Sequence, residues 1–256
     1  MITSLIGLNY LLNNNVSCPA EFSTVWSPYD KANSVFRSRQ YLLESFLVRT
    51  VDSLDSYFML INQSPKLVPA NLQSSFDAAG RSVNKRFEVF FDNFVDQAQG
   101  FREYASLVAL SIQWRNNVTH FNADNILDEK YLTILKSSQE FFESNCRRLN
   151  ILDTINHFHN NDSPTFKETA SIIAATHRFI QFLDARLLRE LGLVEYAFSL
   201  LCKPGNLVQV KGITKERAIR KIVVALSRYG FMEDPSDEGL GDKELEVLYD
   251  RLISLG

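Results

Sequence analysis

Apolar side chains recur with the period of an α-helix along most of this chain, and this period is the strongest constraint on its fold. In the stretch SRQYLLESFLVRTVDSLDSYFMLI the charged residues Glu44, Asp52 and Asp55 lie off the centre of one mostly apolar stripe. That stripe consists of Leu43, Phe46, Leu47, Thr50, Leu54, Tyr57 and Ile61. Because such a helix needs neighbours to cover its stripe, the stretch predicts one member of a helical bundle.

Three further helices are predicted before residue 150. The first spans about 72–97, the second runs from about Phe101 to a polar motif that ends at His120, and the third spans about 127–150. Four amphipathic helices with short connections are most simply buried as a four-helix bundle. We expect a cluster of aromatic residues on the second of the four helices to be core rather than a surface for stacking bases. These residues are Phe87, Phe90, Phe91 and Phe94.

The C-terminal part is predicted to be mostly helical as well. The stretch HFHNNDSPTF at 157–166 is polar, contains a Ser-Pro pair and predicts a linker. Helical patterns follow, although NLVQV at 206–210 favours a short strand. The sequence therefore predicts an all-α chain in three parts. These are an N-terminal lead segment at 1–34, a helical bundle at 35–160 and a mostly helical region at 165–256.

Charge and cysteine content restrict the partners and the compartment. The net charge of −3 gives no overall field toward nucleic acid or anionic lipid, so any RNA contact must be local. The three cysteines Cys18, Cys146 and Cys202 form no metal or disulfide pattern, which favours a reducing, cytoplasmic location. No stretch is long and apolar enough to predict a membrane span, so we expect no membrane partner.

The C-terminal region carries two segments of opposite charge. Residues 211–228 hold six basic residues against one acidic residue, and residues 233–250 hold eight acidic residues against one lysine. In one interpretation these segments pair with each other or with water. In the other, a basic helix binds RNA phosphates while the acidic segment contacts a partner protein. The candidate RNA-binding residues are Lys215, Arg217, Arg220 and Lys221.

The stretch QWRNNVTHF at 113–121 places Arg115, Asn116 and His120 near the end of a predicted helix. RNA can be cleaved without a metal when the 2′-hydroxyl attacks the adjacent phosphorus. Histidine suits the proton transfers, and arginine suits the phosphate because its planar guanidinium donates two parallel hydrogen bonds. On a straight helix Arg115 and His120 would point about 140° apart, so we expect them to converge at a helix end or in a cleft that they line from two sides.

RNNVTH at 115–120 resembles the Arg-x4–6-His motif of HEPN domains, in which a polar residue often follows the arginine, as Asn116 does here. The resemblance covers the motif and the bundle around it, about residues 35–150. It implies a HEPN-like four-helix bundle and a metal-independent endoribonuclease that acts as a homodimer with two motifs facing one cleft. It also implies a role in toxin–antitoxin modules or in phage (antiviral) defence, with an antitoxin or regulatory protein as a possible partner.

The resemblance assigns roles to particular residues. Arg115 would hold the phosphate, His120 would manage protons and Asn116 would support both. An acidic residue of the first bundle helix often joins such sites, and Glu44, Asp52 and Asp55 are the candidates. This sequence departs from antitoxin-modified relatives, which extend the motif to His-x-Tyr, because Asn122 stands at the tyrosine position.

Two alternatives to a nuclease stay open, a non-catalytic module that binds a partner protein and one that binds RNA. In both, Arg115 could form a surface ion pair while His120 caps the helix.

The histidines His157 and His159, with Asp162, are interpreted as solvated linker residues rather than metal ligands. No zinc pattern and no glycine-rich phosphate loop is present, so we expect neither a metal nor a cofactor.

Overall fold

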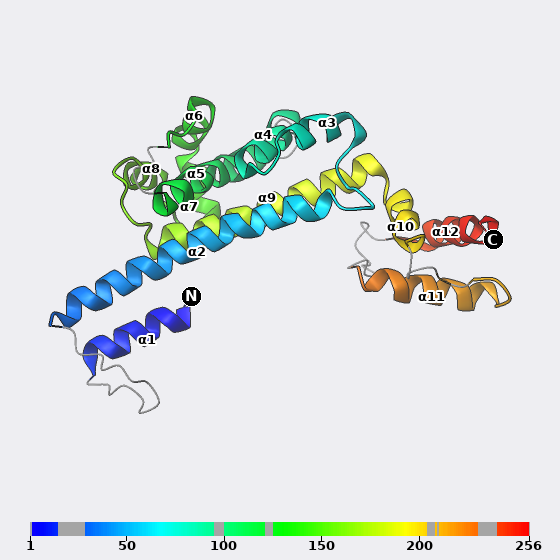
Figure 1. Ribbon diagram of the computed structural model, residues 1–256, viewed down its shortest axis with the longest axis horizontal. Helices are drawn as coiled ribbons and strands as arrows, with labels where there is room; N and C mark the ends of the chain where they lie inside the picture. Colours follow the sequence, from blue (N-terminus) through cyan, green and yellow to red (C-terminus); the bar gives the residue numbers. More distant parts are fainter. Residues whose placement is uncertain are drawn as a thin grey trace. The chain divides into compact units, whose positions relative to one another are not determined.

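The computed structural model describes residues 2–14, 29–94, 100–120, 125–203, 208, 210–229 and 240–255. Within these ranges it contains twelve helices and no strand, which confirms the expected all-α class (Figure 1). The predicted strand at 206–210 falls mostly outside the described residues. The helices are α1 (Ile2–Asn13), α2 (Lys31–Ile61), α3 (Ala70–Ala78), α4 (Val83–Phe94), α5 (Phe101–Thr119), α6 (Glu129–Ser137), α7 (Gln139–Asn145), α8 (Ile151–His159), α9 (Phe166–Leu191), α10 (Leu193–Leu201), α11 (Lys215–Ser227) and α12 (Asp242–Ser254).

Contacts divide the chain into two compact units. The first contains residues 1–58 and 79–182, and the second contains residues 59–78 and 183–256. The sequence places its boundary near residues 160–165, whereas the contacts group the first part of α9, up to residue 182, with the first unit. In the lead segment, none of the residues 3–14 is buried although α1 is rich in apolar side chains.

Phenylalanine side chains build the core of the first unit. The four phenylalanines of α4 are all buried, as the sequence predicts. Ring centroids lie 5.5 Å apart for Phe58 of α2 and Phe90 of α4. They lie 5.2 Å apart for Phe87 of α4 and Phe179 of α9, and 5.6 Å apart for Phe101 of α5 and Phe179. Helices α2, α4, α5 and α9 therefore share one aromatic core.

Helix α5 carries the motif and is the most deeply buried helix of this unit. Every residue from 105 to 112 is buried, including Ser106 and Ser111. The hydroxyl of Ser111 donates to the backbone oxygen of Val108 at 2.7 Å, which satisfies its polarity inside the helix. Trp114 is 1% exposed and donates from Nε1 to the backbone oxygen of Asp162 at 3.0 Å. This burial fixes the C-terminal end of α5, and with it the motif.

Two predicted helices are each broken in the structure. The helix expected at 72–97 is wrong as a single element, because α3 ends at Ala78 and Gly80 turns the chain with a φ of 59° before α4 begins. The helix expected at 127–150 is split into α6 and α7 at Ser138, and residues 146–150 are not helical. The residues that its periodicity places inward are nevertheless buried, namely Leu132, Leu135, Phe142, Cys146 and Leu149. Periodicity identifies the buried face, but it does not distinguish one helix from two that bury the same face.

The linker expected at 157–166 is only partly a loop. Helix α8 continues to His159, and Asn150 caps its start by accepting hydrogen bonds from the N–H groups of Leu152 and Asp153. The non-helical connection is therefore residues 160–165. It is tied to its surroundings by the Trp114 bond and by the hydroxyl of Ser163, which donates to Glu44 Oε1 at 2.5 Å.

Helices α10, α11 and α12 surround a second core in the second unit. Its buried members come from all three helices and from the segment before α11. They are Ala197, Leu201, Val210, Ala218, Ile222, Leu226, Leu245, Leu248 and Leu252. Leu255, which the periodicity places on the same side of α12, is exposed. In the described part of the chain, no helix combines the length and apolarity that crossing a membrane requires.

Candidate functional site

The motif RNNVTH spans the last turn of α5 and the first residue beyond it. The helix ends at Thr119, and His120 has extended backbone angles of φ −117° and ψ 117°. The His120 N–H donates to the backbone oxygen of Asn116 at 3.1 Å and closes the last helical turn. The motif therefore lies at a helix end, as the sequence predicts, and His120 is released from helical geometry.

Asn117 holds this helix end in place, a role that the sequence did not indicate. Its Oδ1 accepts hydrogen bonds from the backbone N–H and from Nδ2 of Asn125, both at 2.9 Å. Its Nδ2 donates to Oδ1 of Asn161 at 3.1 Å. Four asparagines or aspartates follow the motif closely in sequence, so only the tertiary structure shows which of them Asn117 binds.

Arg115 is half-buried at this helix end and incompletely bonded. Its Nε is buried and has no hydrogen-bond partner among the described residues. The hydroxyl of Thr119, one turn further on, donates to the backbone oxygen of Arg115 at 2.8 Å. A buried N–H without an acceptor costs about 1–3 kcal/mol. An anionic ligand oxygen at this position would remove that cost.

The other two motif residues lie nearer to solvent. His120 is exposed, and Asn116 is half-buried. In the described part of the chain no hydrogen bond joins the side chains of Arg115, Asn116 and His120. A single copy of the chain thus positions the three residues on one helix end without assembling them into a bonded triad.

A cavity of about 370 Å³ lies between α2 and the end of α5, and we call it the motif cavity. Val118 and Thr119 of the motif line it from α5, and Glu44 and Asp52 line it from α2. Two of the three predicted supporting acids therefore line a cavity at the end of α5, although Arg115, Asn116 and His120 are not among its lining residues. Arg49 also lines this cavity and is the one cation among its lining residues, a position that the sequence did not single out. Its position on the same helical face as Asp52, three residues earlier, is the signal that would have indicated it.

The third predicted acid has another role. Asp55 accepts a hydrogen bond from the guanidinium of Arg86 at 3.1 Å and forms an ion pair between α2 and α4. It is not among the residues that line the motif cavity. Asp55 is therefore better explained as part of the packing of α2 against α4 than as a site residue.

The basic residues of α11 fall into two groups. Lys215 donates to Glu246 of α12 at 2.8 Å, and this hydrogen bond raises the pKa of Lys215 and lowers the pKa of Glu246. This one pair agrees with the interpretation that the basic and acidic segments pair with each other. By contrast, Arg217, Arg220 and Lys221 are exposed and make no ion pair within the described residues.

The three unpaired cations of α11 share one face. Positions 217, 220, 221, 224 and 228 lie within a narrow sector of a helix with 3.6 residues per turn. Arg228 therefore extends the stripe, and Val224 stands in its middle with 57% of its surface exposed. The opposite face of α11 packs into the second core through Ala218 and its neighbours. The acidic residues at 233–239 lie outside the described residues.

The histidines of the expected linker lie on α8 instead of in a loop. His157 Nδ1 lies 2.8 Å from Oε1 of Glu168, which is almost completely buried. His157 is therefore not a freely solvated histidine, and that expectation is wrong for it. His159 is exposed. Among the described residues, no group of three or more His, Cys, Asp and Glu side chains is arranged to hold a metal ion.

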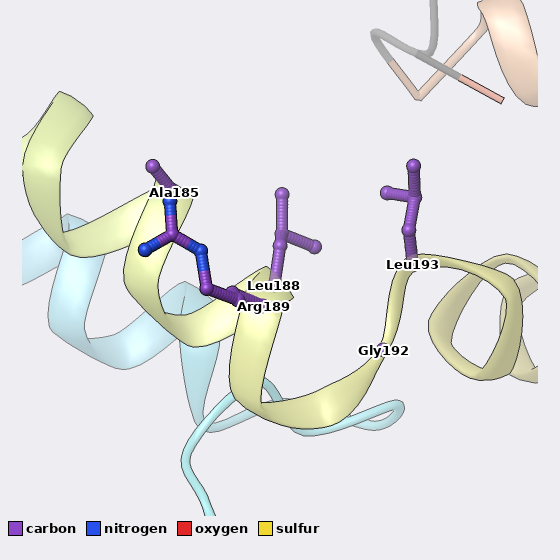
Figure 2. A pocket seen from close by; sticks show the side chains of 5 residues that line it. All are labelled: Ala185, Leu188, Arg189, Gly192 and Leu193. Carbon is purple, nitrogen blue, oxygen red and sulfur yellow. The ribbon is translucent and has the colours of Figure 1, made fainter. Parts of the chain in front are cut away.

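Another cavity, of about 230 Å³, lies where α9 meets α10. Figure 2 shows the side chains of Leu188 and Leu193 pointing to the same side of the chain, with Gly192 between them. Gly192 has a φ of 83°, which permits the abrupt change of direction between the two helices. Arg189 is the single charged residue among those that line this cavity, so it offers less chemistry than the motif cavity.

These features define an all-α protein with an Arg-Asn-x3-His motif at the end of a buried helix. No protein family, curated protein or solved structure matches this chain. Its function must therefore be argued from its own residues.

Proposed function

We propose that this chain is a metal-independent endoribonuclease of the HEPN type, with a HEPN-like helical bundle around the motif. The observation that carries this proposal is the half-buried Arg115, whose Nε lacks a hydrogen-bond acceptor at the end of α5. Arginine is well suited to phosphate, since its guanidinium stays charged and matches two phosphate oxygens at once. The resemblance of RNNVTH to the HEPN motif supports the same assignment.

In the proposed reaction a phosphoryl group of the RNA is transferred from the 5′-oxygen to the 2′-oxygen. The 2′-oxygen forms a bond to phosphorus, and the bond from phosphorus to the 5′-oxygen breaks. The products carry a 2′,3′-cyclic phosphate and a 5′-hydroxyl, while one proton passes from the 2′-oxygen to the 5′-oxygen. Arg115 stabilises the charge that develops on the non-bridging oxygens, and His120 transfers the proton.

The motif cavity would receive the RNA beside the scissile phosphate. Asn116 supports the arginine and the histidine in this proposal, and Arg49 adds a second cation near the phosphate backbone. Glu44 and Asp52 line the same cavity, and in this proposal they orient Arg49 or a ribose hydroxyl. The homodimer implied by the resemblance would bring a second His120 to the same phosphate. The role as a toxin or phage-defence effector, with an antitoxin or regulatory partner, rests on the resemblance alone.

The test is cleavage of total RNA and tRNA by the purified chain in EDTA, beside two variants. We expect the wild type and His159→Ala to cleave and to leave 2′,3′-cyclic phosphate ends. His120→Ala should lose cleavage with an unchanged circular dichroism spectrum, because His120 is exposed and contributes nothing to the core. His159→Ala is the matched control, since it removes another exposed histidine. Cleavage that needs a divalent metal, or that survives in His120→Ala, would refute the proposal.

A second candidate function is RNA binding without cleavage. The observation that favours it is the stripe of exposed, unpaired cations on α11, because such a stripe can contact successive phosphates. This function would not require Arg115 or His120. Loss of RNA binding on neutralising α11, with no cleavage by the wild type, would favour it over the nuclease.

A further inference from the structure

His157 and Glu168 form a hydrogen-bonded pair that the motif does not use. His157 lies near the end of α8, and Glu168 lies in the first turn of α9. The second carboxylate oxygen of Glu168 accepts the N–H of Thr165 at 2.6 Å, and Thr165 Oγ1 accepts the N–H of Glu168 at 3.3 Å. This reciprocal arrangement caps α9 and holds the carboxylate in one position.

The buried carboxylate sets the orientation of the imidazole. Glu168 is 3% exposed, so its charge needs a close donor, and Nδ1–H of His157 supplies it. A histidine held through Nδ1 presents Nε2 to other groups, an arrangement common in sites where histidine acts on a ligand. Nε2 of His157 has no hydrogen-bond partner within the described ranges. Its side chain is 37% exposed.

His157 opens onto a cavity of about 370 Å³ between α2 and residues 160–166, which we call the histidine cavity. Pockets that bind small molecules have volumes of roughly 300–1,000 Å³, so this cavity is of adequate size. Arg39 lines it from α2, and Phe36 and Phe166 give it apolar walls. Arg39 makes no ion pair with any described residue.

The charges around this cavity leave two donors available. Glu168 is engaged by His157 and by the N–H of Thr165. The Glu44 carboxylate, on the same helix as Arg39, accepts the Ser163 hydroxyl. The remaining carboxylate on the cavity wall, that of Asp162, is exposed and therefore screened by water. Arg39 and Nε2 of His157 are thus the groups that can meet a ligand anion.

The wall opposite α2 is held rigidly. Residues 161–163 are each hydrogen-bonded to the first unit, 161 and 162 through Asn117 and Trp114 of α5 and 163 through Glu44 of α2. A cavity that is already formed loses little conformational entropy when a ligand binds.

We propose that the histidine cavity binds a small ligand that carries a phosphate group on a flat apolar body. Arg39 donates to the phosphate. Nε2 of His157 donates to it as well in the imidazolium form, because the Nδ1–H is already given to Glu168. The apolar body lies between Phe36 and Phe166. An arginine and a histidine together match a phosphate monoester, while aromatic walls favour a flat body. This site does not depend on the nuclease proposal, because it involves none of the motif residues.

Histidine side-chain NMR tests the proposal directly, since the chain has only four histidines. The probes are phenyl phosphate, inorganic phosphate and phenol, with His157→Gln and His159→Gln to assign the signals. We expect phenyl phosphate to shift the His157 signal saturably with a Kd of about 1 mM or tighter. Inorganic phosphate should bind more weakly because it lacks the apolar body. Phenol should leave the signal unchanged.

Two arginine variants separate a defined site from general attraction. Arg39→Gln should weaken phenyl phosphate binding by about tenfold or more, because a charge-assisted hydrogen bond is lost. Arg37→Gln removes an exposed cation from the same helix, outside the cavity, and should leave binding unchanged. Equal effects of the two variants, or no saturable shift, would overturn the proposal. A His157 shift with a short RNA but not with phenyl phosphate would also overturn it, and would assign the cavity to RNA.

Discussion

Asn117 lies inside the motif and connects three parts of the chain. Its side chain makes three hydrogen bonds, two with Asn125 and one with Asn161. We expect Asn117→Ala to lower the free energy of unfolding by about 1–3 kcal/mol, because the half-buried groups at Asn125 lose their acceptor. Urea denaturation followed by circular dichroism measures this change.

Asn145 offers a matched control for this prediction. It is exposed and makes a single local bond, from Nδ2 to the backbone oxygen of Phe141 at 3.0 Å. Asn145→Ala should change the free energy of unfolding by less than about 0.5 kcal/mol. Equal losses in the two alanine variants would show that Asn117 does not anchor the helix end.

Cys146 gives a prediction about pH. Burial raises the pKa of its thiol from 9.0 to about 11. Between these two values the unfolded chain has lost the thiol proton and the folded chain has kept it, so stability falls as pH rises. The contribution is fully present below pH 9 and is lost toward pH 11. Urea midpoints at about pH 8 and pH 10.5 should therefore differ less in Cys146→Ala than in the wild type. An unchanged difference would contradict the burial effect.

At the scale of single residues, the sequence predicted the position of the motif residues better than it predicted which side chains contact each other. Arg115, Asn116 and His120 share a helix end, and Glu44 and Asp52 line the cavity beside it. The sequence offered no means to separate these two acids from Asp55, because all three flank the same stripe. The ion pair with Arg86 of α4 made that choice, and Arg86 lies 31 residues away. Long-range contacts of this kind leave no local pattern.

At the scale of helices, α11 has one face that packs and one that is charged. We expect neutralisation of Arg217, Arg220 and Lys221 to glutamine to weaken RNA binding. It should also lower the slope of log K against log salt by about 2, because each phosphate contact with a single strand contributes about 0.7. Fluorescence anisotropy with a labelled single-stranded RNA over a range of salt measures the slope.

The control for α11 must change the net charge equally. Arg81, Lys85 and Lys136 are exposed cations of the first unit, and their replacement by glutamine removes the same charge. This second triple variant should keep the wild-type slope within about 0.5. If both triple variants lower the slope alike, the effect of α11 is one of net charge rather than of a defined surface.

At the scale of helices, the buried face of a helix was the most predictable property. The positions at which a helical stretch breaks were the least predictable. The phenylalanines of α4 and the apolar face of α12 are buried as their spacing predicts, with Leu255 as the exception. The breaks at Gly80 and Ser138 were not anticipated. A stripe that continues across a break satisfies the same period, so the pattern carries no information about the turn.

At the scale of the whole molecule, the nuclease proposal makes a statement about association. If two motifs share one cleft, light scattering should give about twice the chain mass of 29.3 kDa. The specific activity should then fall as the protein is diluted below its dimer dissociation constant. His120→Ala should retain the dimer mass, since an exposed side chain is removed. A monomeric wild type with constant specific activity would refute the shared cleft.

The sequence alone determined the all-α class, the buried faces of its helices and the placement of the motif at a helix end. These properties depend on the spacing of residues within a few turns, which the order of amino acids records directly. The tertiary structure decided that the first part of α9 belongs with the first unit, that Asp55 pairs with Arg86, and that Glu168 orients His157. Each of these depends on side chains that meet only after distant segments have packed, and no local spacing encodes such a meeting.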